Sequence, residues 1–279
     1  MNIVFAHPRH VYGSYADYRR LVELAGFPSI FQDEMDPGAD VTYIAAPVNR
    51  AFKEHVVRHP RGKAKIVWWN LERPDVPTED IGALPGNAVH ASTDSVAPLV
   101  DAIWVSDLGI ASLDKRYRYV FLASDERLAE GSPLPFEYDF CHMAYIWGRR
   151  EVYGELAKKW KVAPAAWGEE RVRIMRSSRA MVNIRQTPAP VRDPLRFALA
   201  AAYKMPIFTE RMELPEPLSP HIHYSEIDLA GVGIQIAPWL KEGGWHSSLK
   251  ERGIALHEIM CREHNFRDAV LGAVRETFP

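Results

Sequence analysis

Short apolar segments alternate with helical patterns along most of this chain, and no other feature of the sequence constrains the fold as strongly. Apolar residues at helical spacing predict helices over Ser14–Leu24 and Arg50–Arg58. Strands that alternate with helices form βαβ units, in which the strands are parallel. We therefore expect a parallel sheet in the first half, with strands at Asn2–Ala6, Val41–Ala46, Lys65–Trp69, Ala88–Ala91, Ala102–Ser106 and Tyr119–Leu122.

A second α/β series follows the segment ERLAEGSPLPFEYDF, in which Gly131, Pro133 and Pro135 interrupt the periodicity. We predict two doubly wound, Rossmann-like α/β domains that face a cleft, over residues 1–130 and 136–279. The strands expected in the second domain are Phe140–Trp147, Ala180–Ile184, Ile207–Thr209 and Ile222–Ser225. Its expected helices are Arg150–Trp160, Glu169–Ser177, Pro194–Tyr203, Ile227–Leu240, Trp245–Glu263 and Arg267–Glu276.

The composition limits the classes of protein to which the chain can belong. Of its 279 residues, 47% are hydrophobic, which suffices for one large core or two smaller ones. The formal net charge of −2 provides no overall basic field that would attract nucleic acid or a membrane. Local basic runs remain at Arg50–Lys65, Lys115–Arg118 and Arg171–Arg179, as solvated faces or as binding surfaces.

The sequence carries no recognisable targeting signal. The first residues, MNIVFAHPRHVYGS, lack a basic region and a long apolar run, and no apolar segment approaches the ~20 residues of a membrane span. Cys141 and Cys261 are too few for a disulfide framework. We therefore expect a soluble cytoplasmic protein with no membrane partner.

The stretch PVRDPLRFALAAAYKMPIFTE places two arginines, Arg192 and Arg196, around the start of an alanine-rich helix. Asp193 is suited to cap this helix, and Pro194 fits its first turn because proline has no N–H group to leave unsatisfied. One interpretation is a helix that only packs against a sheet. The other is an anion site, because a helix N-terminus with an arginine beside it attracts phosphate.

Polar residues collect where the expected strands end, and ligands of open α/β sheets bind at the carboxyl ends of strands. In the first half we regard four such residues as candidates for binding a ligand: His10, Tyr12, Gly13 and Asn70. In the second half the strand ends and the helix start are rich in arginine, which matches phosphate geometry well. These candidates for an anion site are Arg149, Arg150, Arg185, Arg192 and Arg196, although a chance gathering of solvated arginines is the alternative.

Glu72 follows the apolar stretch VWWN, which is typical of a strand buried on both faces. A carboxylate at the rim of a cleft beside Trp68 and Trp69 can have a raised pKa and act as a general base. An ion pair with Arg73, or a helix cap, is the structural alternative.

Several signatures of other chemistry are missing or incomplete. The sequence has no GxGxxG, GxxxxGK[ST] or GxSxG motif, which disfavours dinucleotide-binding, P-loop and α/β-hydrolase interpretations. The run HEIMCREH places His257, Cys261 and His264 on one helical face, but a partly buried helix face explains it better than zinc does. No acidic pair stands at a strand end, so we expect that the protein requires neither a metal ion nor another cofactor.

The second half resembles the C-terminal domain of GT-B glycosyltransferases, which take sugars from nucleotide diphosphates. The matching segments are YIWGRREVYGEL, RVRIMRSSRAMVNI, RDPLRFALAAAYKMPIFTE and HYSEIDLAGVGIQIAPWL, in the order of the family's elements. The resemblance implies that Arg150 and Arg196 contact the donor diphosphate, with Glu210 and Tyr224 as further donor-side residues. Leu199 stands where many members carry a glutamate that binds the ribose.

The compact chain is also similar to phage DNA β-glucosyltransferases, whose catalytic carboxylate follows a strand in a segment similar to VWWNLERPD; Glu72 is the matching residue. This implies metal-independent transfer with inversion, from a nucleotide sugar such as UDP-glucose to a hydroxymethylated pyrimidine in DNA, inside a host cell if the gene is phage-borne. The alternatives are a small sugar or glycan as acceptor, a sugar-nucleotide epimerase, or an inactive nucleotide- or nucleic-acid-binding module. The sequence does not define the oligomeric state.

Overall fold

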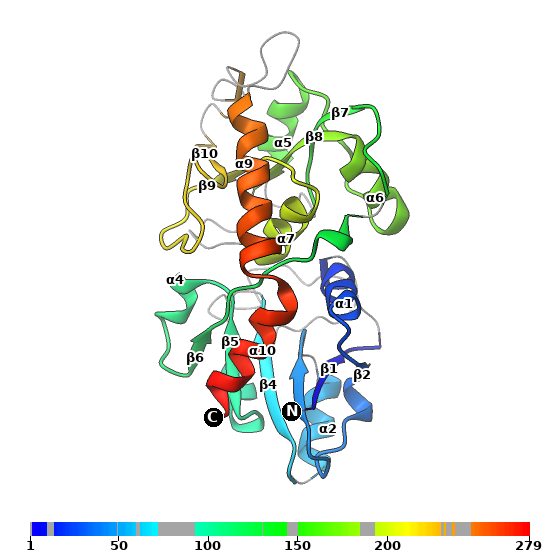
Figure 1. Cartoon of the computed structure of the whole chain (residues 1–279), viewed down its shortest axis with the longest axis vertical. Helices are drawn as coiled ribbons and strands as arrows, with labels where there is room; N and C mark the ends of the chain where they lie inside the picture. Colours follow the sequence, from blue (N-terminus) through cyan, green and yellow to red (C-terminus); the bar gives the residue numbers. More distant parts are fainter. Residues whose placement is uncertain are drawn as a thin grey trace. The chain divides into compact units, whose positions relative to one another are not determined.

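The computed structural model describes residues 2–9, 14–48, 50–59, 62–71, 93–129, 131–143, 150–184, 193–229, 232, 236–237 and 247–279 (Figure 1). The chain divides into two compact units. Unit 1 comprises Met1–Phe121 and Val270–Pro279, and unit 2 comprises Leu122–Ala269. These units differ from the expected ranges of 1–130 and 136–279, because the last ten residues of the chain belong to unit 1.

Unit 1 contains one parallel sheet of six strands in the order β2-β1-β3-β4-β5-β6. The strand order reverses beside β1, since the chain moves to β2 on one side of it and then to β3 on the other. The strands are β1 (Ile3–His7), β2 (Ser29–Phe31), β3 (Thr42–Ala45), β4 (Lys65–Asn70), β5 (Ala102–Val105) and β6 (Tyr117–Tyr119). The helices are α1 (Ser14–Leu24), η1 (Gln32–Glu34), α2 (Arg50–Arg58), α3 (Thr93–Val96), η2 (Ala97–Leu99) and α4 (Leu108–Ala111). Helix α10 (Phe266–Thr277) belongs to unit 1 from Val270 onward.

Two tryptophans fill the centre of unit 1. Trp69 of β4 and Trp104 of β5 are completely buried and meet edge to face, with ring centroids 5.5 Å apart. Each indole N–H donates to a hydroxyl, that of Trp69 to Ser106 Oγ and that of Trp104 to Thr277 Oγ1. The bond to Thr277 attaches α10, from the end of the chain, to β5.

Unit 2 contains a parallel sheet of four strands in the order β10-β9-β8-β7. Its strands are β7 (Tyr138–Cys141), β8 (Ser178–Asn183), β9 (Ile207–Glu210) and β10 (Ser225–Ile227). Its helices are η3 (Glu126–Leu128), α5 (Arg150–Ala157), α6 (Gly168–Ser177), α7 (Pro194–Ala202), α9 (Ser247–His257) and the π-helix η5 (Glu258–Glu263).

Helix α7 lies in the interior of unit 2. All nine of its residues are buried, which is typical of a helix that is apolar around its whole circumference. Its second half is held by two hydrogen bonds from other parts of the unit. Ser124 Oγ donates to the Ala198 carbonyl at 2.7 Å, and His257 Nδ1 donates to the Ala201 carbonyl at 3.0 Å. The position of α7 is therefore fixed along its length.

The structure confirms the predicted α/β class, with a parallel sheet in each unit. Helices α1 and α2 have the predicted bounds, whereas β2 was not expected, because its three half-buried residues form no apolar run. Strand β6 ends at Tyr119, where the predicted strand Tyr119–Leu122 begins. Strand β10 begins at Ser225, where the predicted strand Ile222–Ser225 ends, and it includes Ile227, the expected first residue of the helix Ile227–Leu240. Most of that predicted helix, and the predicted strand Ala88–Ala91, lie outside the described residues. Within the described part, no helix is long and apolar enough to span a membrane.

Candidate functional site

The structure places only some of the residues predicted to form the site. Asn70, Arg196, Glu210 and Tyr224 are described, and Arg150 is described only as the first residue of α5. The other predicted residues lie outside the described part of the chain; they are His10, Tyr12, Gly13, Glu72, Arg149, Arg185 and Arg192.

Asp193 caps the N-terminus of α7, as predicted. Its Oδ1 accepts from the Arg196 backbone N–H at 3.2 Å, and Pro194 occupies the first turn. Its Oδ2 also forms an ion pair with Arg196 Nε at 3.0 Å. The capping carboxylate therefore orients the Arg196 side chain as well as the helix.

A chain of side-chain hydrogen bonds holds the guanidinium of Arg196 from its other side. Arg196 Nη1 donates to Asn183 Oδ1, and Asn183 Nδ2 donates to Thr209 Oγ1 at 3.1 Å. An arginine has no acceptor, so the amide oxygen of Asn183 must face it and the amide nitrogen must face Thr209. We call this chain of Thr209, Asn183 and Arg196 the Arg196 relay. It joins the ends of β8 and β9 to the start of α7.

Within the described part of the chain, the contacts of the Arg196 side chain involve two of its three nitrogens. The side chain is only 9% exposed, and its Nε and Nη1 face Asp193 and Asn183. The described residues provide no hydrogen-bond acceptor for Nη2. A guanidinium that is fixed on two sides and has an unbonded third side is a preorganised donor for an anion.

Two further polar side chains, Glu210 and Tyr153, share this environment. Glu210 is the last residue of β9 and is 8% exposed, and Tyr153 of α5 is 5% exposed. Burial raises the pKa of Tyr153 to about 12, while Arg196 acts to lower this pKa and Glu210 acts to raise it. Tyr153 belongs to the same buried cluster as Ile184, whose carbonyl Arg196 Nη1 approaches at 3.5 Å, and Glu210 follows Thr209 at the end of β9. We call Tyr153, Asn183, Arg196, Thr209 and Glu210 the edge site.

Three members of the edge site were not predicted from the sequence. Asn183 and Thr209 lie at strand ends inside segments that resemble the glycosyltransferase family, but an amide and a hydroxyl are too common to mark a site. Tyr153 follows Arg150 by three residues, and this spacing on a helix was the signal that could have found it.

The structure does not bring Tyr224 to the same edge. Tyr224 is completely buried and immediately precedes β10, whose first residue Ser225 pairs with Phe208. Its ring packs edge to face on Phe197, with centroids 5.6 Å apart. The predicted donor contact of Tyr224 stays a prediction, and its observed surroundings are those of a core residue. Leu199 is likewise buried in α7.

Polar side chains also collect at the carboxyl ends of the strands of unit 1. Asn70 ends β4 and His7 ends β1, at 7% and 6% exposure. Gln32 spans the point where the strand order reverses, since its Nε2 donates to the carbonyls of Pro47 and Ala6. Burial lowers the pKa of His7 below its ordinary value, which favours a neutral imidazole. The sequence predicted His10 in this loop, and the structure adds His7.

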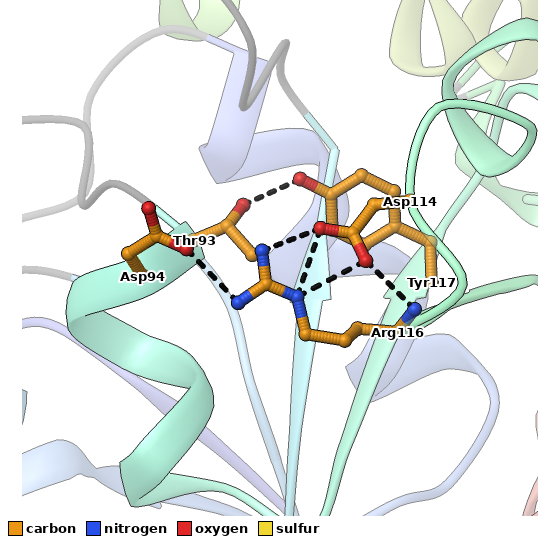
Figure 2. Close-up of polar contacts among 5 residues, drawn as sticks. All are labelled: Thr93, Asp94, Asp114, Arg116 and Tyr117. Carbon is orange, nitrogen blue, oxygen red and sulfur yellow. Dashed lines mark hydrogen bonds and ion pairs between the residues drawn. The ribbon is translucent and has the colours of Figure 1, made fainter.

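The basic run Lys115–Arg118 is occupied by contacts within unit 1. Figure 2 shows the Arg116 guanidinium between the carboxylates of Asp114 and Asp94, beside the paired hydroxyls of Thr93 and Tyr117. We call these five residues the Arg116 cluster. They join α3 to the start of β6.

Other arginines of the basic runs are also engaged. Arg118 Nη2 bonds to the Glu276 carboxylate at 2.8 Å, and its Nη1 donates to the Glu276 carbonyl. In α2, Arg58 forms an ion pair with Glu54 at 3.3 Å. These contacts are within unit 1, so the three arginines are not uncompensated charges.

The run HEIMCREH does not form one regular helical face. His257 ends α9 and is completely buried, while Cys261 lies in the π-helix that follows. The π-helix changes the spacing, so the predicted alignment at i, i+4 and i+7 is lost. Among the described residues, no group of three His, Cys, Asp or Glu side chains is arranged to hold a metal ion.

Solved structures with a similar fold are glycosyltransferases. The DNA-modifying enzyme β-glucosyltransferase, solved with and without uridine diphosphoglucose, is 14% identical, with a TM-score of 0.53 over 99% of this chain and 100% of that one. HepE from Anabaena, solved with UDP and glucose, is 8% identical, with a TM-score of 0.63 over the same shares. Sucrose-phosphate synthase from Thermosynechococcus elongatus is 10% identical, with a TM-score of 0.60 over 100% and 99%.

These similarities define the fold. The chain has the GT-B fold of the glycosyltransferases, as the sequence resemblance implied. No protein-family model matches the sequence, and no curated protein matches it significantly.

Proposed function

We propose that this protein is a glycosyltransferase that moves a sugar from a nucleotide-diphosphate sugar to an acceptor hydroxyl. The observation that carries the proposal is the edge site, where the Nη2 of a buried, oriented arginine faces no acceptor among the described residues. The edge site lies at the N-terminus of α7 and at the carboxyl ends of β8 and β9, which is the usual ligand position in parallel sheets. The fold adds support, because HepE is solved with UDP and the DNA β-glucosyltransferase with uridine diphosphoglucose.

The proposed donor contacts follow from the chemistry of each side chain. Arg196 and the N-terminus of α7 hold the diphosphate, with help from Arg149, Arg150, Arg185 and Arg192 where these reach it. Glu210 has only acceptor oxygens when ionised, so it suits a hydroxyl of the sugar or the ribose. Tyr224 contacts the donor only if the site extends beyond the edge site.

The reaction is a displacement at the anomeric carbon. The acceptor oxygen loses its proton to a base and bonds to that carbon, while the bond from the carbon to the diphosphate oxygen breaks. The electron pair of the broken bond stays on the diphosphate, where arginine and the helix N-terminus stabilise the added negative charge. One such displacement inverts the configuration. Arginine and the helix N-terminus thus stabilise the leaving group as a metal ion does in other enzymes, so we expect that the reaction requires no metal ion.

Two residues are candidates for the base. Glu72 matches the family carboxylate by its place after the VWWN segment. His7 is the described alternative, because it ends β1 and its lowered pKa leaves the imidazole neutral and able to accept a proton. His10, Tyr12, Gly13 and Asn70 are the proposed acceptor contacts.

Two classes of molecule are candidates for the acceptor. A hydroxymethylated pyrimidine in DNA is suggested by the likeness to the DNA-modifying enzyme. The ion pairs of Arg58, Arg116 and Arg118 weaken this suggestion, since DNA recognition relies on uncompensated cations along the phosphates. A small sugar or glycan does not need such cations and is the second acceptor class.

The test is a transfer assay preceded by a binding measurement. Calorimetry with UDP, GDP and their glucose derivatives, with and without EDTA, identifies the donor. Radiolabelled donor is then incubated with hydroxymethylated duplex DNA, unmodified DNA and a panel of mono- and oligosaccharides. Label on an acceptor, lost in Glu72→Gln or His7→Gln while donor binding persists, supports the transferase and identifies its base.

Three outcomes count against the proposal. Binding of nucleotides without transfer or donor hydrolysis favours an inactive binding module. Conversion of the free nucleotide sugar to its epimer favours an epimerase. No binding of any nucleoside diphosphate contradicts the donor site itself.

A further inference from the structure

Among the described residues, the buried hydroxyl of Tyr153 in unit 2 has no hydrogen-bond partner. The Tyr153 side chain is 5% exposed and packs in the core of the unit, with its ring 4.4 Å from that of His142. Ile184 belongs to the same buried cluster, and the hydroxyl forms no hydrogen bond of normal geometry with any described group. Buried hydroxyls are nearly always bonded, so an unbonded one needs an explanation.

The surroundings of this hydroxyl point to a ligand. It interacts electrostatically with Arg196 and Glu210, the two charged members of the edge site. Arg196 Nη1 also approaches the Ile184 carbonyl at 3.5 Å, so the same backbone residue is a neighbour of both side chains. Tyr153 and Ile184 also belong to one buried cluster, so the phenol and the Arg196 guanidinium are neighbours of the same residue.

We propose that the Tyr153 hydroxyl is a binding group for the donor diphosphate and donates its hydrogen to a phosphate oxygen that Arg196 also contacts. This inference rests on the proposed function and adds a neutral donor to the cationic ones. A neutral donor bonds a phosphate oxygen without adding a charge that would hold the diphosphate after transfer.

The chemistry favours a phosphate oxygen over a sugar hydroxyl. With a pKa of about 12 the phenol keeps its proton at neutral pH, so it is available as a donor. A phosphate oxygen is the stronger acceptor, and the bond to it is charge-assisted. Glu210, which only accepts when ionised, is the member suited to hydroxyls.

This role has an unusual signature in the variant Tyr153→Phe. The substitution removes an oxygen that has no partner in the free protein, so the thermal stability should stay the same or rise. The same oxygen is bonded in the complex, so affinity for the diphosphate should fall. A tyrosine with a purely structural hydroxyl would lose stability and keep its affinity.

The experiment compares wild type, Tyr153→Phe and the control Tyr138→Phe by calorimetry and thermal unfolding. Tyr138 is the matched tyrosine of unit 2, since its hydroxyl accepts from Arg173 away from the edge site. The probes are UDP, inorganic pyrophosphate and uridine. We expect Tyr153→Phe to bind UDP and pyrophosphate about tenfold more weakly, with uridine unchanged and Tyr138→Phe equal to wild type.

The outcomes separate this inference from the proposed function. Equal affinity of wild type and Tyr153→Phe for UDP and pyrophosphate overturns the inference and leaves the donor site intact. Absence of nucleotide and pyrophosphate binding by the wild type overturns both. If Tyr153→Phe is misfolded by circular dichroism, Tyr153→Met replaces it, since methionine also fills the space without a hydroxyl. Weakening of uridine binding as strong as that of UDP also contradicts the phosphate contact.

Discussion

Arg116 of unit 1 and Arg196 of unit 2 both stand beside aspartates, yet their surroundings differ in two respects. The Arg116 side chain is 41% exposed and bonds to the carboxylates of Asp114 and Asp94 (Figure 2). The Arg196 side chain is 10% exposed and faces one carboxylate, from Asp193, and one neutral amide, from Asn183. The first arginine is solvated and faces two carboxylates, and the second is buried and faces one.

The difference separates a structural arginine from the arginine that we propose as a binding residue. Two carboxylates more than neutralise one guanidinium, so Arg116 has little attraction left for a phosphate. Arg196 has one carboxylate partner, Asp193, and one neutral partner, Asn183, so its partners carry no excess negative charge. Its low exposure also limits screening by water. The number of acidic neighbours and the exposure of the side chain therefore predict function better than the presence of arginine in a basic run.

The first prediction tests whether Arg196 and Arg116 differ in their contribution to nucleotide binding. Arg196→Ala should weaken binding of a nucleoside diphosphate by about 1.5–3 kcal/mol, or roughly tenfold to a hundredfold, because a charge-assisted contact is lost. Calorimetry at fixed ionic strength measures this change. The control Arg116→Ala should bind the same nucleotide as wild type does.

Equal losses of nucleotide affinity in Arg196→Ala and Arg116→Ala, or no loss in either, would contradict this prediction. Since Arg196 is buried, circular dichroism and thermal unfolding must accompany the measurement. Arg196→Lys provides a second control, because it keeps the charge but not the planar fork that contacts Asp193 and Asn183. It should bind more weakly than wild type and more tightly than Arg196→Ala.

The second prediction concerns the Arg196 relay, which has no counterpart in the Arg116 cluster. Thr209→Val removes the oxygen that accepts from Asn183 Nδ2 and frees the amide to turn away from Arg196. We expect diphosphate affinity about three- to tenfold lower, roughly the value of one neutral hydrogen bond. Thr209→Ser keeps the hydroxyl and should restore the affinity. Loss of affinity in both variants would indicate packing rather than positioning.

The fold could be predicted from the sequence because strands and helices each produce a regular spacing of apolar residues. Strands such as β4 and helices such as α1 alternate in a pattern that only βαβ units satisfy, and this pattern survives errors of a few residues at each boundary. The strands β2 and β10 were missed or shifted since each has three residues, too few to establish a period.

The site was less predictable, and the reason is physical. Arg196 was found because a cap and a proline mark its helix start. Asn183, Thr209 and Tyr153 act through contacts between segments far apart in the chain, and such contacts leave no local pattern. The sequence also cannot tell a compensated arginine from a partly compensated one, because Asp94 lies 22 residues from Arg116.

The third prediction compares one histidine in each unit. Burial lowers the pKa of His7 in unit 1 and of His223 in unit 2 below the ordinary value. As the pH falls below about 6.5, the unfolded chain therefore takes up these protons first. The stability that the neutral imidazoles contribute is complete above this pH and is lost below it.

Thermal unfolding at pH 7.5 and 5.5 measures this loss. The melting temperature should fall at the lower pH, and His7→Gln and His223→Gln should each reduce the fall by about 1–3 °C. His221→Gln is the matched control, because His221 is exposed and lies two residues from His223. An undiminished fall in both variants would assign the pH dependence to other groups.

The smallest effect is expected where the polar contacts are most numerous. Asp94→Asn removes one of the two carboxylates that bond to Arg116, at a position where the Asp94 side chain is 88% exposed. Exposed ion pairs contribute little, since water screens them and ordering two side chains costs entropy. The melting temperature should change by no more than ~2 °C, and the change should shrink further in 0.5 M salt.

The variant also sharpens the comparison with Arg196, because Arg116 then faces one carboxylate and one amide, as Arg196 does. If partial compensation alone made an anion site, Asp94→Asn would gain affinity for pyrophosphate. We expect no gain, because solvent still screens the Arg116 guanidinium, and calorimetry with pyrophosphate therefore separates the effect of burial from that of compensation.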